Sequence, residues 1–217
     1  MGRLLLIDVA GSVAVLGLWY FVFSAYNRKK GAAALRWVQT ACAGKGRILE
    51  SRWMGSSRLQ ARLHFPSRWF ENARVTMSFR PRALPIQWLL SCCQRQKETL
   101  TFEADLDCAP GVRLEVLRHR WLTHSDNQLL RKSRNWTVVR PGPVVLTTCT
   151  RLKQELPPVI NTLMTSRGHN LLTVRFRPES PHLAATIDLE SLCDEQSAAS
   201  FLGVLRDLAA GPSAHRK

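Results

Sequence analysis

A long apolar run near the N-terminus constrains this chain more than any other feature. Residues 4–26 read LLLIDVAGSVAVLGLWYFVFSAY, with Asp8 as the single charge, and the polar stretch Asn27-Arg28-Lys29-Lys30 follows at once. About 20 apolar residues suffice for a helix to cross the hydrocarbon core of a bilayer. We therefore predict a single transmembrane helix with a basic stop over residues 1–30, followed by a juxtamembrane helix over residues 31–46.

A cleaved signal peptide is the alternative for this run. Such a peptide has a basic start, an apolar core of about 7–15 residues and a small-residue cleavage site. Here the apolar run is longer, only Arg3 precedes it, and the small residues at 32–34 lie behind the basic cluster. The pattern favours an uncleaved anchor.

The flanking charges predict how the anchor is oriented. Arg3 stands before the run, whereas Arg28, Lys29, Lys30 and Arg36 follow it. Positive residues accumulate on the cytoplasmic side, so we expect the N-terminus outside and the C-terminal domain in the cytoplasm. Three aromatic residues near the inner end are the predicted interfacial anchors: Trp19, Tyr20 and Tyr26. Asp8 is explained either by a place at the outer interface or by contact with a partner helix.

The remaining chain is strongly basic and unevenly so. It has 31 basic and 16 acidic residues, a net charge of +15, and residues 28–96 hold 14 basic and 2 acidic residues, a net charge of +12. Anionic lipid attracts such a surface, as does an acidic protein partner or nucleic acid. Of these we expect lipid and a protein partner rather than nucleic acid. The predicted contact residues are Arg28, Lys29, Lys30, Arg58, Arg62, Arg74, Arg80 and Arg82.

Apolar and polar residues alternate in several segments after the anchor, as in half-buried antiparallel strands. The clearest segments are 58–65, 73–80 and 99–106; others are 47–54, 112–118, 136–140, 143–149, 171–177 and 182–189. Helical spacing appears at 157–167 and at 196–210, where Gly211-Pro212 ends the pattern. The predicted class is α+β: one transmembrane helix, then antiparallel sheet and two to four helices.

The domain limits are predicted at residues 47–211, with a frayed tail at 212–217. The polar segment 119–135 has no clear period and is expected to be a long loop, where two subdomains could meet. Whether strands 58–80 and 171–189 share one sheet stays open at this level.

Residues 83–93, ALPIQWLLSCC, are apolar but about half the length of a membrane span. We favour a buried core helix here. The alternative is an interfacial segment, flanked by Arg80, Arg82 and Arg95, that enters the headgroup layer.

Four Arg–Trp pairs occur, at Arg36-Trp37, Arg52-Trp53, Arg68-Trp69 and Arg120-Trp121. We expect a core tryptophan beside a surface arginine in each pair. The alternatives are headgroup anchoring and stacking on single-stranded nucleic acid.

Catalytic motifs are lacking in the sequence. The histidines and cysteines do not have metal-ligand spacing, and no phosphate-binding loop occurs, so no catalytic residue, metal or cofactor is assigned. We expect Glu103, Asp105 and Asp107 to pair with the arginine-bearing strands. The sequence thus predicts a single-pass, membrane-anchored basic binding or scaffold protein rather than an enzyme. The alternatives are a nucleic-acid-binding protein and a tethered enzyme that uses Glu103, Asp105, His119 and His124.

Overall fold

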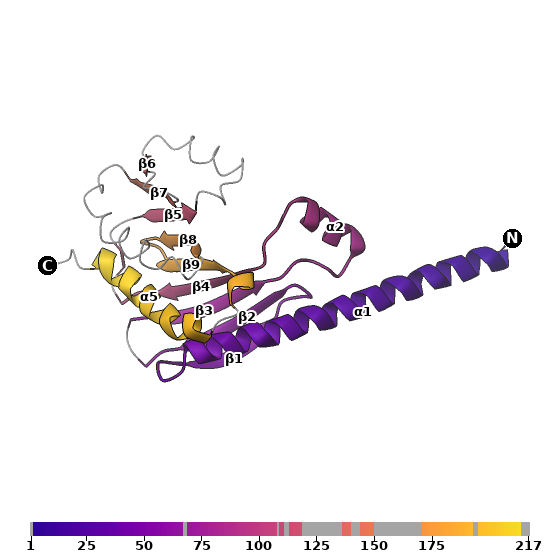
Figure 1. Ribbon diagram of the computed structural model, residues 1–217, viewed down its shortest axis with the longest axis horizontal. Helices are drawn as coiled ribbons and strands as arrows, with labels where there is room; N and C mark the ends of the chain where they lie inside the picture. Colours follow the sequence, from indigo (N-terminus) through magenta and orange to yellow (C-terminus); the bar gives the residue numbers. More distant parts are fainter. Residues whose placement is uncertain are drawn as a thin grey trace.

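A single long helix leads into a sheet domain. The computed structural model describes residues 2–66, 69–107, 109–110, 113–118, 136–139, 144–149, 171–192 and 195–213. Helix α1 (Gly2–Ala41) has 40 residues and runs without interruption from the apolar segment into the domain (Figure 1). Its length and composition are sufficient to cross a membrane, and its most apolar part is not covered by the rest of the protein.

The described strands form one nine-stranded antiparallel sheet, in the order β1-β2-β3-β4-β9-β8-β5-β7-β6. They are β1 (Arg47–Trp53), β2 (Arg58–His64), β3 (Glu71–Ser78), β4 (Thr99–Asp105), β5 (Leu114–Arg118), β6 (Trp136–Val139), β7 (Val144–Cys149), β8 (Leu171–Phe176) and β9 (Leu183–Asp188). A 3-10 turn, η4 (Leu189–Ser191), follows β9. Strand β4 pairs with β9, with Phe102 opposite Ala185. This pairing joins strands 58–80 and 171–189 in one sheet.

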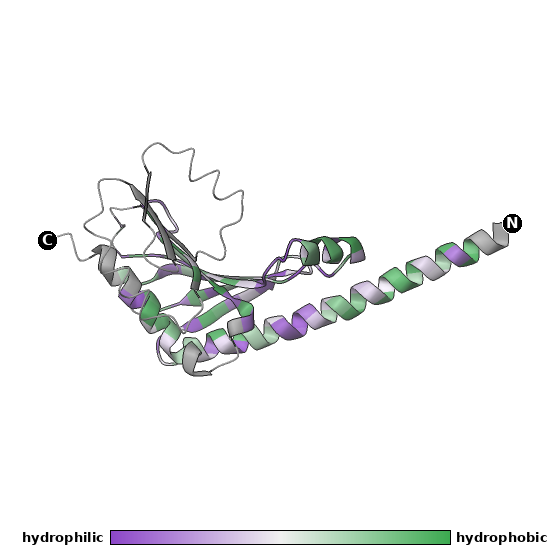
Figure 2. Cartoon of the chain, turned by 45° about the horizontal axis from the view of Figure 1, so that its top comes forward, coloured by the Kyte–Doolittle hydropathy of each residue, from purple (hydrophilic) through white to green (hydrophobic). Residues whose placement is uncertain are grey.

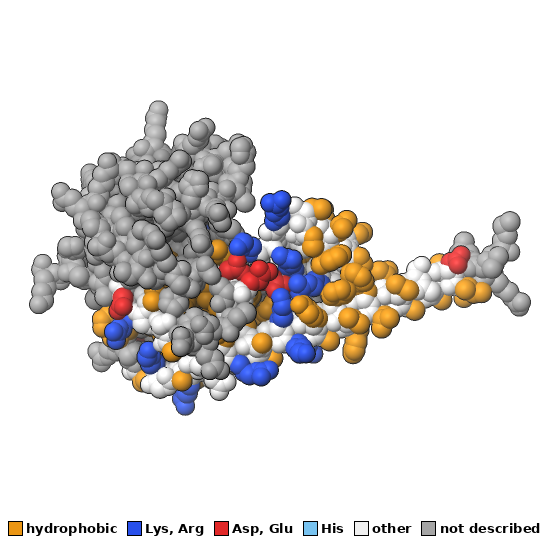
Figure 3. Space-filling view, in the orientation of Figure 1, with side chains coloured by type: hydrophobic (Ala, Val, Ile, Leu, Met, Phe, Trp, Pro, Cys, Tyr) orange, Lys and Arg blue, Asp and Glu red, His pale blue; other side chains and the backbone are white. Residues whose placement is uncertain are grey.

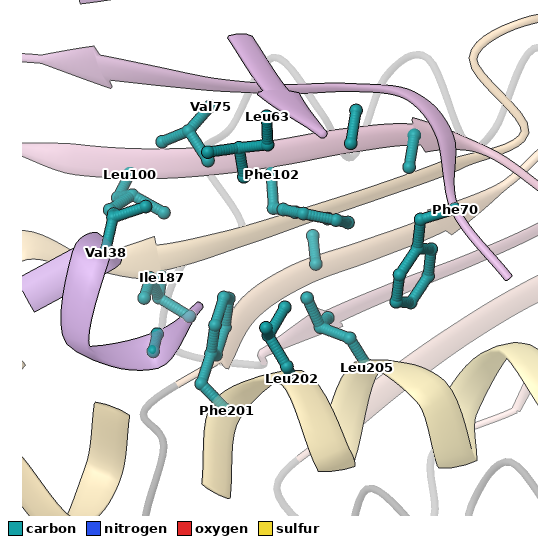
Figure 4. Close-up of a cluster of buried hydrophobic side chains, with 14 of the residues drawn as sticks. Val38, Leu63, Phe70, Val75, Leu100, Phe102, Ile187, Phe201, Leu202 and Leu205 are labelled. Atoms are coloured by element: carbon teal, nitrogen blue, oxygen red, sulfur yellow. The ribbon is translucent and has the colours of Figure 1, made fainter. Parts of the chain in front are cut away.

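One face of the sheet carries the hydrophobic core. Helix α5 (Glu195–Ser213) and the C-terminal part of α1 cover this face (Figure 1). Val38 of α1 and Phe201 and Leu205 of α5 point toward Phe102 and Ile187 of the sheet (Figure 4). Alternation decides which side chains take part: along β2, Leu59, Ala61 and Leu63 are buried, whereas the flanking arginines are exposed.

The strand pattern of the sequence is confirmed to within two residues at most ends. Of the juxtamembrane helix predicted at 31–46, residues 31–41 are helical, but they continue α1 rather than form a separate helix, and a turn follows at 42–45. The last helix ends at Ser213, so it includes the Gly211-Pro212 pair that we expected to end it. Helix-breaking residues act over a turn, and boundaries shift by a residue or two. The helix predicted at 157–167 and the loop predicted at 119–135 lie outside the described residues.

The prediction of a core helix at 83–93 was wrong. Helix α2 (Pro85–Cys93) forms there, but Ser91 is its only buried residue. The side chains of Leu84, Ile86, Leu89 and Leu90 are between 51 and 74% exposed. The helix belongs to a 20-residue excursion, residues 79–98, between the paired strands β3 and β4, and it projects away from the sheet on the side of α1 (Figure 2). An apolar run of this length fits a core or an interface equally well, so periodicity could not decide.

Candidate functional site

Helix α1 changes its surroundings abruptly at Asn27. Almost every described side chain before this point is exposed, up to 74% for Phe21. From Asn27 onward a buried stripe recurs at helical spacing, through Gly31, Ala34 and Val38. A Cβ atom at Gly31 would come within 2.7 Å of the Trp53 ring, so glycine permits the close approach of α1 to the sheet. The apolar and docked parts of α1 therefore meet within one helical turn.

A group of polar side chains fixes α1 to the sheet at this point. We call it the junction cluster: Tyr26, Asn27, Lys30, Arg82 and Glu98. The Lys30 Nζ atom lies 2.7 Å from one Glu98 carboxylate oxygen, and an Arg82 nitrogen lies 2.9 Å from the other. A second Arg82 nitrogen donates to the Asn27 side-chain oxygen at 3.1 Å. The Arg82 guanidinium also lies 4.8 Å from the centre of the Tyr26 ring.

Glu98 is the centre of the cluster because it is buried and has two cationic partners. Its side chain is 2% exposed, and it also accepts a 3.3 Å hydrogen bond from the backbone N–H of Arg80. The Asn27 amide donates to the Ser56 carbonyl oxygen at 3.1 Å. Buried charges are tolerated when they are paired and hydrogen-bonded, as here. The cluster thus ties three segments together: α1, the β1–β2 turn and both ends of the 79–98 excursion.

Helix α2 contacts the apolar part of α1 through aromatic rings. The Trp88 ring centre lies 5.9 Å from that of Trp19 and 6.5 Å from that of Phe23. The Trp19 indole N–H donates to the Arg82 carbonyl oxygen at 3.0 Å. We call Trp19, Phe23 and Trp88 the aromatic contact. It places α2 beside residues 19–23 of α1, before the junction cluster in the chain.

The C-terminus of α2 ends in a Schellman motif. The N–H of Gln96 donates to the Ser91 carbonyl at 3.0 Å, and the N–H of Arg95 donates to the Cys92 carbonyl at 3.0 Å. Arg95 has a φ of 50°, a left-handed conformation that usually favours glycine. The end of α2 therefore carries the exposed side chain of Arg95 at a position where glycine would have less backbone strain.

The predicted cationic residues occupy three kinds of environment. Arg28, Lys29, Arg58 and Arg62 are exposed. Arg74 and Arg80 are attached to their neighbours: the Arg74 Nε atom lies 2.5 Å from Glu103, and Arg80 donates to the Gln96 carbonyl at 2.9 Å. Lys30 and Arg82 belong to the junction cluster. Of the predicted anchors, Tyr20 is exposed, whereas Tyr26 and Trp19 contact the excursion.

Three residues of this site escaped the sequence analysis: Asn27, Trp88 and Glu98. A signal existed for Glu98, because it is the only acidic residue between Glu71 and Glu103 in a strongly basic segment. Its partner Lys30 lies 68 positions away, so no local pattern could connect the two.

The acidic residues of β4 bind side chains of β3. Glu103 pairs with Arg74 across the β3–β4 ladder, as expected from the sequence, whereas Asp105 accepts a 3.0 Å hydrogen bond from Asn72 rather than from an arginine. The expected pairing of Asp107 stays a prediction. Burial acts to raise the pKa of Asp105, but hydrogen bonds from Asn72 and Ser180 and the charge of His182 outweigh it and hold that pKa below its ordinary value. Among the described residues no group of three or more potential metal ligands occurs. His119 and His124 lie outside those residues.

Two of the four Arg–Trp pairs combine a core tryptophan with a surface arginine, as predicted. The Trp37 ring contacts Phe201 and the Trp53 ring contacts Phe79, at 5.3 and 5.7 Å between centres, while Arg36 and Arg52 are exposed. Trp69 is instead 48% exposed. Arg68, Arg120 and Trp121 lie outside the described residues.

No protein-family model matches the chain, and no curated protein matches it significantly.

Proposed function

We propose that the chain is a single-pass membrane protein and that its domain lies at the cytoplasmic face, with strand β2 directed away from the membrane. The domain serves as a basic binding or scaffold module. The change in α1 at Asn27 carries this proposal. Apolar, uncovered surface precedes that residue, and a docked, ion-paired helix follows it. The cations after the apolar run favour a cytoplasmic domain.

The way in which α1 packs on the sheet determines how far each cation lies from the proposed bilayer. Asn27 bonds to Ser56, just before β2, whereas a Cβ atom at Gly46 would meet Phe65, just after β2. Strand β2 therefore runs away from the membrane along α1. Arg62 lies four residues beyond Arg58, about 13 Å farther from the lipid at the usual strand rise. The Debye length in the cell is only about 8 Å, so the two arginines meet different fields.

We assign the near cations to anionic headgroups: Arg28, Lys29, Arg58 and Arg80. The far cations Arg47 and Arg62, on the open part of the sheet, face an acidic protein partner. Nucleic acid is less suited to this surface, because the outward side chains of β2 and β3 include no Phe, Tyr or Trp on which bases could stack.

The test uses the full-length chain in zwitterionic nanodiscs, with fluorescent polyglutamate as an acidic probe and single-stranded DNA as the competitor class. Arg62→Ala should weaken polyglutamate binding by about two- to fivefold, since one exposed charge pair contributes up to about 1 kcal/mol. Arg206→Ala is the matched control, because Arg206 is exposed on α5, the helix that covers the opposite face. Salt should reduce binding of the wild type more than that of Arg62→Ala.

Three results would overturn parts of the proposal. If carbonate washing releases the chain from native membranes, the anchor is wrong. If Arg206→Ala and Arg62→Ala have equal effects, the assigned face is wrong. If DNA binds and polyglutamate does not, the nucleic-acid alternative replaces the protein partner.

A further inference from the structure

We infer that α2 is a second membrane-contacting element, which inserts its apolar side chains into the boundary between headgroups and acyl chains of the inner leaflet. This inference rests on the proposed anchoring of α1. Its occupant is lipid, and three observations support it: the position of α2 along α1, the continuity of the apolar surface, and the charges around the excursion.

The aromatic contact sets the depth of α2. The apolar run begins after Arg3, and a span needs about 20 residues, so the inner boundary of the hydrocarbon lies no earlier than Phe23. The polar Asn27 places this boundary no later than Tyr26. Trp19 then lies about 6–10 Å inside the hydrocarbon, at a helix rise of 1.5 Å per residue. Trp88 contacts both Trp19 and Phe23 and so lies between the depths of these two residues, inside the boundary of the hydrocarbon. Interfacial helices bury their apolar faces by about 5–10 Å.

The apolar surface of α2 is continuous with that of α1. Figure 3 shows hydrophobic side chains of the two helices as one patch, with Lys and Arg gathered along its border toward the domain. Water-exposed patches of this kind mark interaction sites, and α1 already places this one against lipid. The side chains that α2 and its start contribute are Leu84, Ile86, Leu89 and Leu90.

The charges of the excursion fit a lipid surface. Residues 79–97 contain no acidic residue. Of the four cations of the excursion, Arg82 pairs with the buried Glu98 and Lys97 pairs with Asp188, which leaves Arg80 and Arg95 to meet headgroups. Arg95 is held at the end of α2 in its left-handed conformation, where an exposed guanidinium reaches phosphate at the level of the headgroups. A helix that faces water would need polar residues on its outer side. In α2, however, Gln87 is the only polar residue between Ile86 and Ser91.

The test applies photoreactive phospholipids to the wild-type chain. The full-length protein is reconstituted in liposomes in which the lipid carries a diazirine near the start of an acyl chain, and the adducts are mapped after trypsin digestion. Cleavage after Arg82 and Arg95 releases residues 83–95 as one peptide, and cleavage after Arg28 releases the span. Residues 114–118 of β5, released by cleavage after Arg113 and Arg118, form the control peptide. We expect adducts on 83–95 at a yield comparable to that of the span, and none on 114–118.

The outcomes separate this inference from the proposed anchor. Adducts on the span without adducts on 83–95 overturn the role of α2 and leave the anchor intact. The lack of adducts on both peptides overturns the anchor. If a photoprobe that is not attached to lipid instead crosslinks residues 83–95 to a protein, α2 contacts a second copy of the chain or another protein. The inference is then wrong.

Charged variants provide a second measurement. Ile86→Glu with Leu89→Glu should abolish lipid adducts on 83–95 while those on the span persist, because both side chains are exposed and neither supports the core. Leu49 on β1 is also exposed, so Leu49→Glu is the matched control and should not change the yield of lipid adducts on either peptide. Persistence of the 83–95 adducts in the double variant would contradict insertion of α2.

Discussion

At the scale of single residues, the charge of a side chain says little about its role until its partners are known. Arg82 and Arg58 are equivalent in the sequence, yet Arg82 is buried between Asn27 and Glu98, and Arg58 is exposed. The count of cations predicted a basic surface but could not identify which cations hold the protein together. That distinction depends on Glu98, whose contacts are distant in the chain.

Removing the Glu98 carboxylate should strongly destabilise the domain. In Glu98→Ala the charges of Lys30 and Arg82 lose their counterion, and breaking a buried ion pair in this way costs about 3–5 kcal/mol. Denaturant unfolding of the full-length chain in detergent measures the change. Glu103→Ala is the control, because its pair with Arg74 is partly exposed and contributes about 1 kcal/mol or less. Equal losses in the two variants would contradict the central place of Glu98.

The cysteines should differ sharply in reactivity. Burial raises the pKa of the Cys42 thiol to about 11, so at pH 8 only about one thousandth of it is thiolate. Cys92 and Cys93 are exposed on α2. Iodoacetamide should therefore modify Cys92 in the folded detergent-solubilised chain and reach Cys42 only after denaturation, as read by mass spectrometry. Alkylation of Cys42 at the rate of Cys92 under native conditions would show that its site is open.

At the scale of elements, the sequence predicts the strands whose apolar residues recur with a regular period. It fails for an element such as α2, because the same composition fits either the core or an exposed position. Strict alternation identified β2, β3 and β4 because each has one buried and one open face. The same reasoning misplaced α2. Its residues are as apolar as a core helix, and only contact with α1, more than 60 positions earlier, shows that it lies outside the core. The junction cluster was likewise unpredictable, since it joins three segments that are distant in the chain: α1, the β1–β2 turn and the two ends of the 79–98 excursion.

The fit of α1 against the sheet should depend on Gly31. Replacing glycine by alanine inside a helix normally gains about 0.5–1 kcal/mol. Gly17→Ala should show this gain or no change, because nothing lies within 4 Å of its Cβ position. Gly31→Ala should instead lose stability by about 1–3 kcal/mol, because the new methyl group meets Trp53. Thermal unfolding in detergent compares the two, and a stabilising Gly31→Ala would contradict the close contact.

At the scale of the whole molecule, one helix provides both the apolar segment that is proposed to span the membrane and part of the core. Val38 and Ala41 belong to the same hydrophobic cluster as Phe102 and Phe201. A domain on a flexible linker could sample many heights above the bilayer, whereas the proposed anchor would hold this domain at one height, because α1 continues without a break into the core. The proposed separation of near and far cations along β2 depends on that rigid connection.

The height of the domain can be measured directly. Thr40 is exposed on α1 and lies 13 residues beyond Asn27, about 20 Å along the helix. A fluorophore on Thr40→Cys, in a background without other reactive cysteines, should report this distance by energy transfer to a dye in the inner leaflet. Glu98→Gln, which loosens the junction cluster, should broaden the distance distribution. A wild-type distance as broad as that of the variant would indicate a flexible connection.

The unbroken course of α1 also has a mechanical consequence. Consecutive residues of an α-helix are separated by about 100° of rotation, and no break in α1 separates the span from the docked segment. If the apolar part of α1 spans the membrane as proposed, any turn or tilt of this helix against a neighbour in the lipid would turn the whole sheet with it. The direction in which Arg62 faces would then be set from within the bilayer.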